Sequence, residues 1–335
     1  MTKINHVKNV LKSILKDSLQ FIAIVVFVAL FSGVFGTENS LAGVSLVIGV
    51  MMFPLCYTGV TRKHMCVQII AMYTLLPILA ALSTYNIYLG LVINFLTISW
   101  IMITSSEPNI MIPHFTYVLT YSFCLLSNVT GKAFILREIS MIAGGIIIAA
   151  VTCICWRRKK LGDNGRSFRS HISLCIKNNK QLIFRLTIGY CVSIFICNLL
   201  GLPRAAWAAI PVLSVTQTDY KNTSRRMGIR LLSTIAGASV FALLFGYVLP
   251  EQYYSFVPLI LGYMGCFSFM KKYGIQQFFN AINAMYAALV IFNIGEDITN
   301  RIICLLIGLA VVAAMMLVDK LMFSRKEEQT VEMLT

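Results

Sequence analysis

Long apolar stretches alternate with short polar segments along almost the whole chain of 335 residues. A helix needs about 20 apolar residues to cross the hydrocarbon core of a bilayer, and about twelve stretches reach or approach that length. Their apolar residues are continuous rather than alternating, which favours helices over the strands of a membrane barrel. The predicted spans are 19–36, 41–60, 65–82, 87–105, 110–128, 139–156, 182–200, 205–218, 229–248, 253–270, 275–294 and 302–323.

Composition agrees with an all-α integral membrane protein. Hydrophobic residues make up 58% of the chain and charged residues only 12%, so a water-soluble fold would have too few charges to cover its apolar surface. The net charge of +15 would fit nucleic-acid binding, but its distribution indicates membrane topology instead. With the N-terminus inside, only four of the 28 Lys and Arg residues fall in outer segments: Lys132, Arg137, Arg204 and Arg301. The positive-inside rule then predicts that both termini are cytoplasmic and that nucleic acid is no partner.

Patterns typical of catalytic or cofactor sites do not occur in the sequence. The ten cysteines lie mostly inside apolar stretches and form no pair with zinc spacing. The four histidines show no metal spacing, and neither a phosphate-binding loop nor a nucleophile elbow is present. We therefore predict no enzyme activity, no cofactor, no metal and no ATP-driven pump within this single chain.

The longest interval between apolar stretches, 157–181, is basic and polar, and it divides the spans into two groups of six. Positions in the two groups correspond at a shift of about 164 residues, as Arg137 and Arg301 do. An even number of spans gives two repeats the same orientation in the membrane. The predicted parts are an amphipathic cytoplasmic segment or helical lead-in, 1–18; a six-helix half, 19–156; a cytoplasmic linker, 157–181; a second six-helix half, 182–323; and a cytoplasmic tail, 324–335.

The second span of each half contains a proline, Pro54 in the first half and Pro211 in the second, and the span with Pro211 is also short. An interrupted helix frees backbone carbonyls that lipid cannot pair. Such helices at matching positions of two repeats point to the binding site of a transporter. A tolerated kink is the alternative interpretation.

An arginine precedes a glycine by seven residues at three places within or at the start of predicted spans. Seven residues make nearly two helical turns, so both residues share a face, where glycine permits close helix packing. An arginine near a helix N-terminus adds to the attraction of the helix dipole for an anion. The three pairs are Arg137/Gly144, Arg230/Gly237 and Arg301/Gly308. We predict anion sites with Arg137, Arg204 and Arg301 outside and with Arg225, Arg226 and Arg230 inside; the alternatives are snorkelling and pairing with Glu138 or Asp297.

Polar and titratable residues inside predicted spans are further candidates. Gln276, Asn280 and Asn283 share one face of the eleventh span, where they line a path or bond helices together. Candidate proton carriers are His114 in the fifth span, close to Glu107 in sequence; Asp219 after the eighth; and Asp319 in the last, unless it is paired or at the interface.

Three segments of the second half resemble the fusaric acid resistance and aromatic acid exporter family. They are RAAWAAIPVLSV from Arg204, NTSRRMGIRLLSTIAG from Asn222 and RIICLLIG from Arg301. The resemblance covers about 182–323. The first half departs from the family pattern, because Ala42 stands where Trp207 would align and the third span lacks the Arg-to-Gly spacing.

The resemblance implies a proton-driven secondary transporter in a bacterial inner membrane, which exports aromatic carboxylic acids or similar amphipathic organic anions. The chain is similar to a compact family member without large cytoplasmic domains. Some members act with a periplasmic adaptor protein of the membrane-fusion type, and homo-oligomers are also open. In this hypothesis Arg204 and Arg301 meet the anion outside, Arg225, Arg226 and Arg230 meet it inside, Trp207 forms an aromatic wall and the eleventh-span stripe lines part of the path.

Two other functions stay open at this point. One is a membrane subunit of a multi-component efflux assembly without transport of its own, for which the basic linker 157–181 would be a docking surface or a surface for anionic lipid. The other is a passive organic-anion channel, because plant malate channels are distant relatives of the family.

The predicted topology is tested by reporter fusions. A reporter fused after Trp156 is expected on the cytoplasmic side, because the sixth span returns the chain to the inside. A fusion after Tyr85, in a predicted outer loop, is the matched control and is expected outside. Enzymatic and fluorescent reporters that work on opposite sides of the membrane measure both locations. A periplasmic reporter after Trp156 would contradict the topology.

Overall fold

The computed structural model describes residues 2–106, 112–250, 252, 260, 262–264, 272–286 and 293–332. Helix dominates these residues, and the pairing of Val60 with Arg166 is an isolated β-bridge. Eight helices among them are long and apolar enough to cross a membrane, by length and composition. The prediction of an all-α, multi-pass membrane protein is therefore confirmed at this level.

The eight candidate spans lie in the long helices of the described residues. Three further helices are shorter: α5 (Ile112–Leu126), α8 (Ala206–Val215) and α11 (Tyr273–Tyr286). The spans lie in α1 (Thr2–Phe35); η1 (Thr37–Asn39) with α2 (Ser40–Met52) and η2 (Phe53–Leu55); α3 (Arg62–Ser83); α4 (Ile87–Ser105); α6 (Gly131–Arg158); α7 (Phe168–Leu199); α9 (Tyr220–Leu243) with η3 (Leu244–Val248); and α12 (Ile294–Glu332).

The helices agree with the predicted spans to different degrees. The bounds of α4 are those predicted, and α8 is short as expected. Most of the span 253–270 lies outside the described residues, as does Glu107, so the number of twelve stays a prediction. The helix α1 is continuous, which favours a helical lead-in over a separate segment. Half of the predicted linker is also helical, because α7 begins at Phe168.

The chain forms two compact units. The larger unit contains Phe31–Thr223 and Leu306–Thr335, and the smaller unit contains Met1–Leu30 and Ser224–Leu305. These units divide the chain at other places than the two predicted halves, so the duplication and the parallel orientation of the halves also stay predictions.

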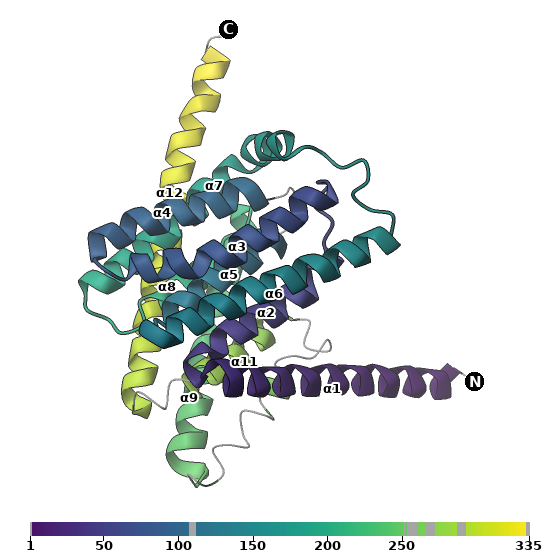
Figure 1. Ribbon diagram of the computed structural model, residues 1–335. Helices are drawn as coiled ribbons and strands as arrows, with labels where there is room; N and C mark the ends of the chain where they lie inside the picture. Colours follow the sequence, from purple (N-terminus) through teal and green to yellow (C-terminus); the bar gives the residue numbers. More distant parts are fainter. Residues whose placement is uncertain are drawn as a thin grey trace. The chain divides into compact units, whose positions relative to one another are not determined.

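In the larger unit, α3 packs against α6, α4 packs against α7, and α7 packs against α8 (Figure 1). Two glycines of the Arg-to-Gly pairs permit close helix approach here. A Cβ atom at Gly144 would collide with Leu46 of α2, and one at Gly308 would collide with the carbonyl oxygen of Ala208 in α8. Pro211 lies inside α8, which continues to Val215, so this proline does not interrupt the helix and the alternative of a tolerated proline holds here.

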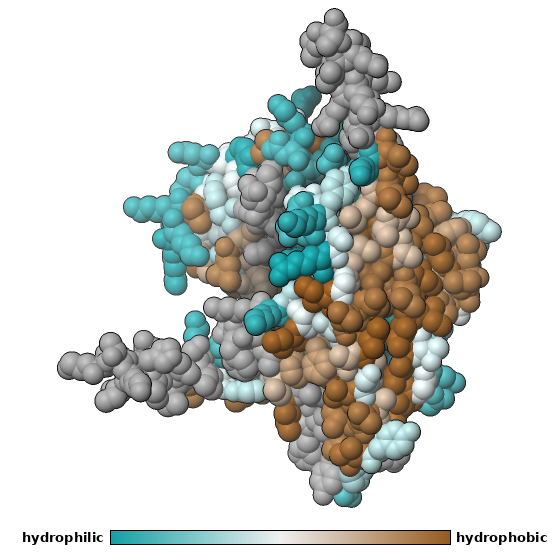
Figure 2. Space-filling model, turned by 180° about the vertical axis from the view of Figure 1, so that it is seen from behind, coloured by the Kyte–Doolittle hydropathy of each residue, from teal (hydrophilic) through white to brown (hydrophobic). Residues whose placement is uncertain are grey.

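The outside of the molecule carries many exposed apolar side chains, as a lipid-facing surface requires. Hydrophobic residues gather over a broad part of the face seen in Figure 2. The helix α6 alone exposes a row of isoleucines: Ile135, Ile139, Ile142, Ile146, Ile147 and Ile154.

Neighbouring helices supply the donors for the carbonyl groups at the C-terminal end of α4. The side chain of Gln68 in α3 donates to the carbonyl oxygen of Thr104 at 3.0 Å, and Nε2 of His171 in α7 lies 3.1 Å from the same oxygen. Asn179 donates to the carbonyl oxygen of Ser106 and has non-helical backbone angles, so α7 is kinked at this residue. The end of α4 and the kink of α7 therefore stabilise each other.

Arg137 of α6 donates hydrogen bonds to the free carbonyl groups at the C-terminal end of α5. Its guanidinium group donates to the carbonyl oxygens of Cys124 at 3.4 Å, Ser127 at 2.5 Å and Glu38 at 3.3 Å, and to the side chain of Asn39 at 2.9 Å. All three nitrogens of the guanidinium group are used by the protein itself. Arg137 therefore joins α5, α6 and η1, and its part in an outer anion site stays a prediction.

The smaller unit has its own apolar core. Gly237 of α9 lies against Phe278 and Ala281 of α11, so these two helices approach closely. The buried core cluster consists of Ala238, Phe241, Phe245, Phe279, Ala281, Ile282 and Met285.

The role of Arg137 predicts a large effect on stability. Replacing Arg137 by Ala leaves several buried carbonyl groups without a donor and is expected to lower the free energy of unfolding by about 3 kcal/mol. Thermal unfolding of the purified protein in detergent measures the change. The exposed Lys132 on the same helix provides the control, Lys132→Ala, which should leave the melting temperature within about 1 °C. Equal melting temperatures for the two variants would contradict this role.

Candidate functional site

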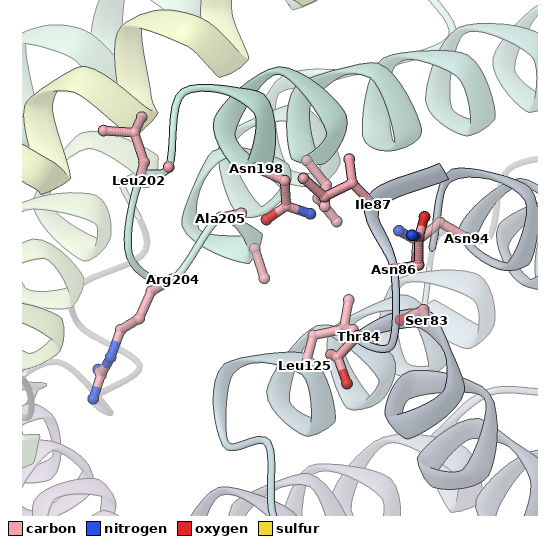
Figure 3. A pocket seen from close by; sticks show the side chains of 13 residues that line it. Ser83, Thr84, Asn86, Ile87, Asn94, Leu125, Asn198, Leu202, Arg204 and Ala205 are labelled. Atoms are coloured by element: carbon pink, nitrogen blue, oxygen red, sulfur yellow. The ribbon is translucent and has the colours of Figure 1, made fainter. Parts of the chain in front are cut away.

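A cavity of about 400 Å³ opens at one end of the larger unit. The loop from α3 to α4 and the loop from α7 to α8 border it, and the sequence places both loops outside (Figure 3). Its lining includes the polar residues Ser83, Thr84, Asn86, Asn94, Asn198 and Arg204 and the apolar residues Ile87, Leu125, Ile194 and Leu202.

Local hydrogen bonds hold the polar groups of this outer cavity. Asn86 caps α4, because its side-chain oxygen accepts from the backbone N–H of Tyr88 at 2.8 Å. The hydroxyl of Tyr121 in α5 donates to the side-chain oxygen of Asn94 at 2.6 Å. The hydroxyls of Tyr190 in α7 and Ser122 in α5 are 2.8 Å apart, and the rings of Tyr121 and Tyr190 are 6.3 Å apart. Two buried polar pairs therefore lie between α4, α5 and α7, and Asn94 of one pair lines the outer cavity.

Arg204 and Trp207, which were predicted to bind the anion, lie next to each other. The guanidinium carbon of Arg204 is 5.4 Å from the centre of the Trp207 ring, a cation–π contact. Figure 3 shows the guanidinium group of Arg204 pointing away from Asn86 and Asn94. Arg204 has a left-handed backbone with a φ of 58°, which costs about 1–2 kcal/mol for a residue with a Cβ. Trp207 is buried in α8 and is not among the residues that line the cavity.

Asp319 forms a buried cluster with two residues that sequence analysis did not select. Its carboxylate is 3.2 Å from Nε of Arg185 and accepts a hydrogen bond of 2.6 Å from the hydroxyl of Tyr220. Arg185 also lies over the Tyr220 ring at 4.7 Å and donates to the carbonyl oxygen of Thr218 at 2.9 Å. The side chains of Arg185 and Asp319 are 2% and 0% exposed.

The sequence contains a signal for this pair. Arg185 was counted as a basic residue of the cytoplasmic side, although it lies inside the predicted span 182–200, and Asp319 lies inside 302–323. Two ionisable residues of opposite charge within predicted spans are a reason to expect pairing. Asp319 is thus paired, which is one of the alternatives considered for it.

The other candidate proton carriers have different surroundings. His114 in α5 is 1% exposed. Asp219 is exposed at the start of α9, where its carboxylate accepts from the backbone N–H groups of Lys221 and Asn222, each at 3.2 Å. An aspartate at this position stabilises a helix N-terminus, so Asp219 has a structural role whether or not it moves protons.

The smaller unit brings together two arginines of the Arg-to-Gly pairs. Arg230 in α9 and Arg301 in α12 are 4% and 5% exposed, and Asp297 is also buried. Arg301 is close enough to Arg230 to be repelled by it and close enough to Asp297 to be attracted. Arg226 contacts the ring of Tyr273 at 4.9 Å, whereas Arg225 is exposed.

The polar stripe of α11 lies on the side of the helix away from the apolar core of the smaller unit. Gln276 and Asn280 are exposed and Asn283 is half-buried, whereas Ile282 and Met285 belong to the core cluster. The stripe belongs to the smaller unit and the outer cavity to the larger unit, and the role of the stripe in a path stays a prediction.

The apolar helices, the lipid-type surface and the buried ionisable groups define a multi-pass helical membrane protein. Residues 192–315 match the family described as fusaric acid resistance protein-like. This match confirms the resemblance noted in the second half and includes the segments that begin at Arg204, Asn222 and Arg301.

Two curated relatives are similar to part of the chain. The uncharacterized protein slr1298 of Synechocystis sp. (strain ATCC 27184 / PCC 6803 / Kazusa) is 25% identical over 129 residues, which are 38% of this chain and 17% of the relative. The uncharacterized protein YhfK of Escherichia coli (strain K12) is 28% identical over 153 residues, which are 45% of this chain and 21% of the relative. The matched part is therefore about a fifth of the length of these relatives. No solved structure matches the chain.

Proposed function

We propose that the protein is an inner-membrane secondary transporter that exports aromatic carboxylic acids or similar amphipathic organic anions with the energy of the proton gradient. The observation that carries the proposal is the family match over residues 192–315. The eight helices of membrane-spanning length supply the setting that such a transporter needs.

The chemistry of the outer cavity supports an amphipathic anion as the transported molecule. Its volume of about 400 Å³ lies within the range of about 300–1,000 Å³ that is typical of small-molecule sites. Amide and hydroxyl groups offer hydrogen bonds to a carboxylate, while Ile87, Leu125 and Ile194 offer an apolar wall to a ring. The guanidinium group of Arg204 points away from Asn86 and Asn94. The other donors of the lining are neutral and hold an anion weakly, which suits a site that releases its ligand to the outside.

The buried charges suggest where the anion is attracted inside the membrane. Among the described residues, Arg230, Arg301 and Asp297 are buried and close enough to interact, and buried arginines of this kind are candidates for attracting an organic anion. Of the three candidate proton carriers, Asp319 is the buried carboxylate inside a span, and an intramembrane carboxylate is a functional candidate. His114 and Asp219 are the other two.

The proposal is tested by measuring efflux. Cells that make the protein are expected to expel a subset of a panel of labelled aromatic acids at least about tenfold faster than cells without it. A protonophore should abolish the difference, since coupled export needs the gradient. Efflux that depends on the protein but ignores the protonophore would indicate a passive channel, and the absence of any difference for every acid would favour a subunit without transport of its own.

Arg301 is expected to be required for this efflux. Arg301→Ala should lower the rate about tenfold or more, because the buried positive charge that attracts the anion is lost. Arg158→Ala, at the exposed end of α6, removes the same charge from a residue outside the proposed binding set and serves as the control. Membrane levels of both variants are compared on immunoblots. Unchanged efflux in Arg301→Ala, at normal protein level, would exclude Arg301 from the transport path.

A further inference from the structure

A second cavity, of about 270 Å³, lies in the larger unit at the kink of α7. It owes its form to Asn179, whose backbone leaves the helical conformation with φ −120° and ψ 22° while its side chain binds the end of α4. The polar residues around it include Lys177, Asn179, Lys180, Gln181, Arg185 and Thr218. Its volume is close to the lower limit of about 300 Å³ for ordinary ligand sites, so it suits a small molecule.

The charges around this inner cavity are all positive. Lys177, Lys180 and Arg185 line it, and no carboxylate is among the described residues of its lining. The two lysines are exposed, whereas Arg185 is buried. The nearest acidic groups have other partners: Asp319 is bound to Arg185 and Tyr220, and the exposed Asp219, next to Thr218, caps α9.

Arg185 lines the cavity, and one of its donor groups has no acceptor among the described residues. Its Nε is engaged by Asp319 and by the carbonyl oxygen of Gln181, and its Nη2 by that of Thr218. Its Nη1 is buried and has no hydrogen-bond partner within the part of the chain that the structure describes. A buried guanidinium N–H without an acceptor is costly, and an anionic oxygen is the acceptor that satisfies it best.

We propose that the inner cavity binds the carboxylate group of a small organic anion, with Arg185 as the buried contact and Lys177 and Lys180 at the mouth. The inference rests on the proposed function and gives it a cytoplasmic binding site, because the sequence places this region inside. Asn179 at this cavity and Asn198 at the outer cavity are nineteen residues apart on α7. At about 1.5 Å per residue the separation is about 28 Å, close to the thickness of a bilayer core.

Asp319 then acts as an internal competitor of the ligand. Its carboxylate holds one edge of the Arg185 guanidinium group and reduces the attraction of that group for a second anion. Removing the negative charge of Asp319 should strengthen anion binding. If the ion pair were purely structural, removing this charge would weaken anion binding or leave it unchanged. The direction of the change in affinity therefore separates the two roles.

The first test uses variants that leave the buried cluster intact. The full-length protein is placed in phosphatidylcholine nanodiscs, and the dissociation constant for radiolabelled benzoate is measured by equilibrium dialysis. Lys177→Gln with Lys180→Gln is expected to weaken binding about fivefold or more. Lys12→Gln with Lys159→Gln, at exposed positions that do not line the cavity, changes the net charge equally and should alter binding less than about twofold. Equal effects of the two double variants, or no benzoate binding by the wild type, would overturn the inference.

The second test uses the sign of the effect at Asp319. Asp319→Asn is expected to bind benzoate at least about threefold more tightly than the wild type. The double variant Arg185→Gln with Asp319→Asn is expected to bind it about tenfold more weakly than the wild type. Circular dichroism and monodispersity confirm that each variant is folded. Weaker or unchanged binding in a folded Asp319→Asn variant would contradict the competition and assign the pair a structural role.

A third set of experiments asks whether the cavity binds a carboxylate or the phosphate of a lipid headgroup. It also tests the binding site and the transport activity independently of each other. If phosphatidylglycerol in the nanodiscs blocks benzoate binding, and its own retention depends on Lys177 and Lys180, the occupant is a lipid headgroup and the inference fails. Efflux of the same variants is measured in cells. If the variants change benzoate binding as expected but no efflux is seen, the proposed function alone is refuted. If efflux is seen but benzoate binding is unchanged in every variant, the inner site alone is refuted.

Discussion

Lipid offers no hydrogen-bond partner to the end of a helix, and this constraint governs the fold of the larger unit. Arg137 of α6 donates to the free carbonyl groups at the end of α5, and Gln68, His171 and Asn179 surround those at the end of α4. A neighbouring helix takes the place of water in both cases. The contacts that satisfy the helix ends therefore also determine which helices lie together, and they produce the kink of α7 from which the inner cavity arises.

The sequence predicted the helices well because length and continuous apolar character are properties of a single segment. The bounds of α4 and the shortness of α8 follow directly from these properties. Contacts between segments cannot be predicted in this way, because the residues that form them are far apart in the sequence. Asn39 and Arg137 are 98 residues apart, and Tyr220 and Asp319 are 99 residues apart. A single sequence shows that such residues lie in spans, but it does not show which helix face meets which.

The Arg-to-Gly pairs show how one sequence pattern can serve different purposes. The glycines behave alike, because Gly144, Gly237 and Gly308 each permit a close helix contact. The arginines do not, since Arg137 is fully used by acceptors of its own chain, whereas Arg301 lies beside another arginine. Packing needs only a small residue at the right face, but the role of a buried charge depends on every group around it. The packing role was therefore easier to predict than the charge role.

The Arg185–Asp319 pair is best explained by the needs of the state without ligand. A buried ion pair adds little to stability compared with apolar residues of the same volume, because both charges lose their hydration. An arginine that waits inside the membrane for an anion, however, needs a counter-charge whenever the site is empty. Asp319 supplies that charge, and Tyr220 holds the carboxylate in place. In the proposed inner site a bound carboxylate would supply the same charge, so the ligand and Asp319 compete for one guanidinium group.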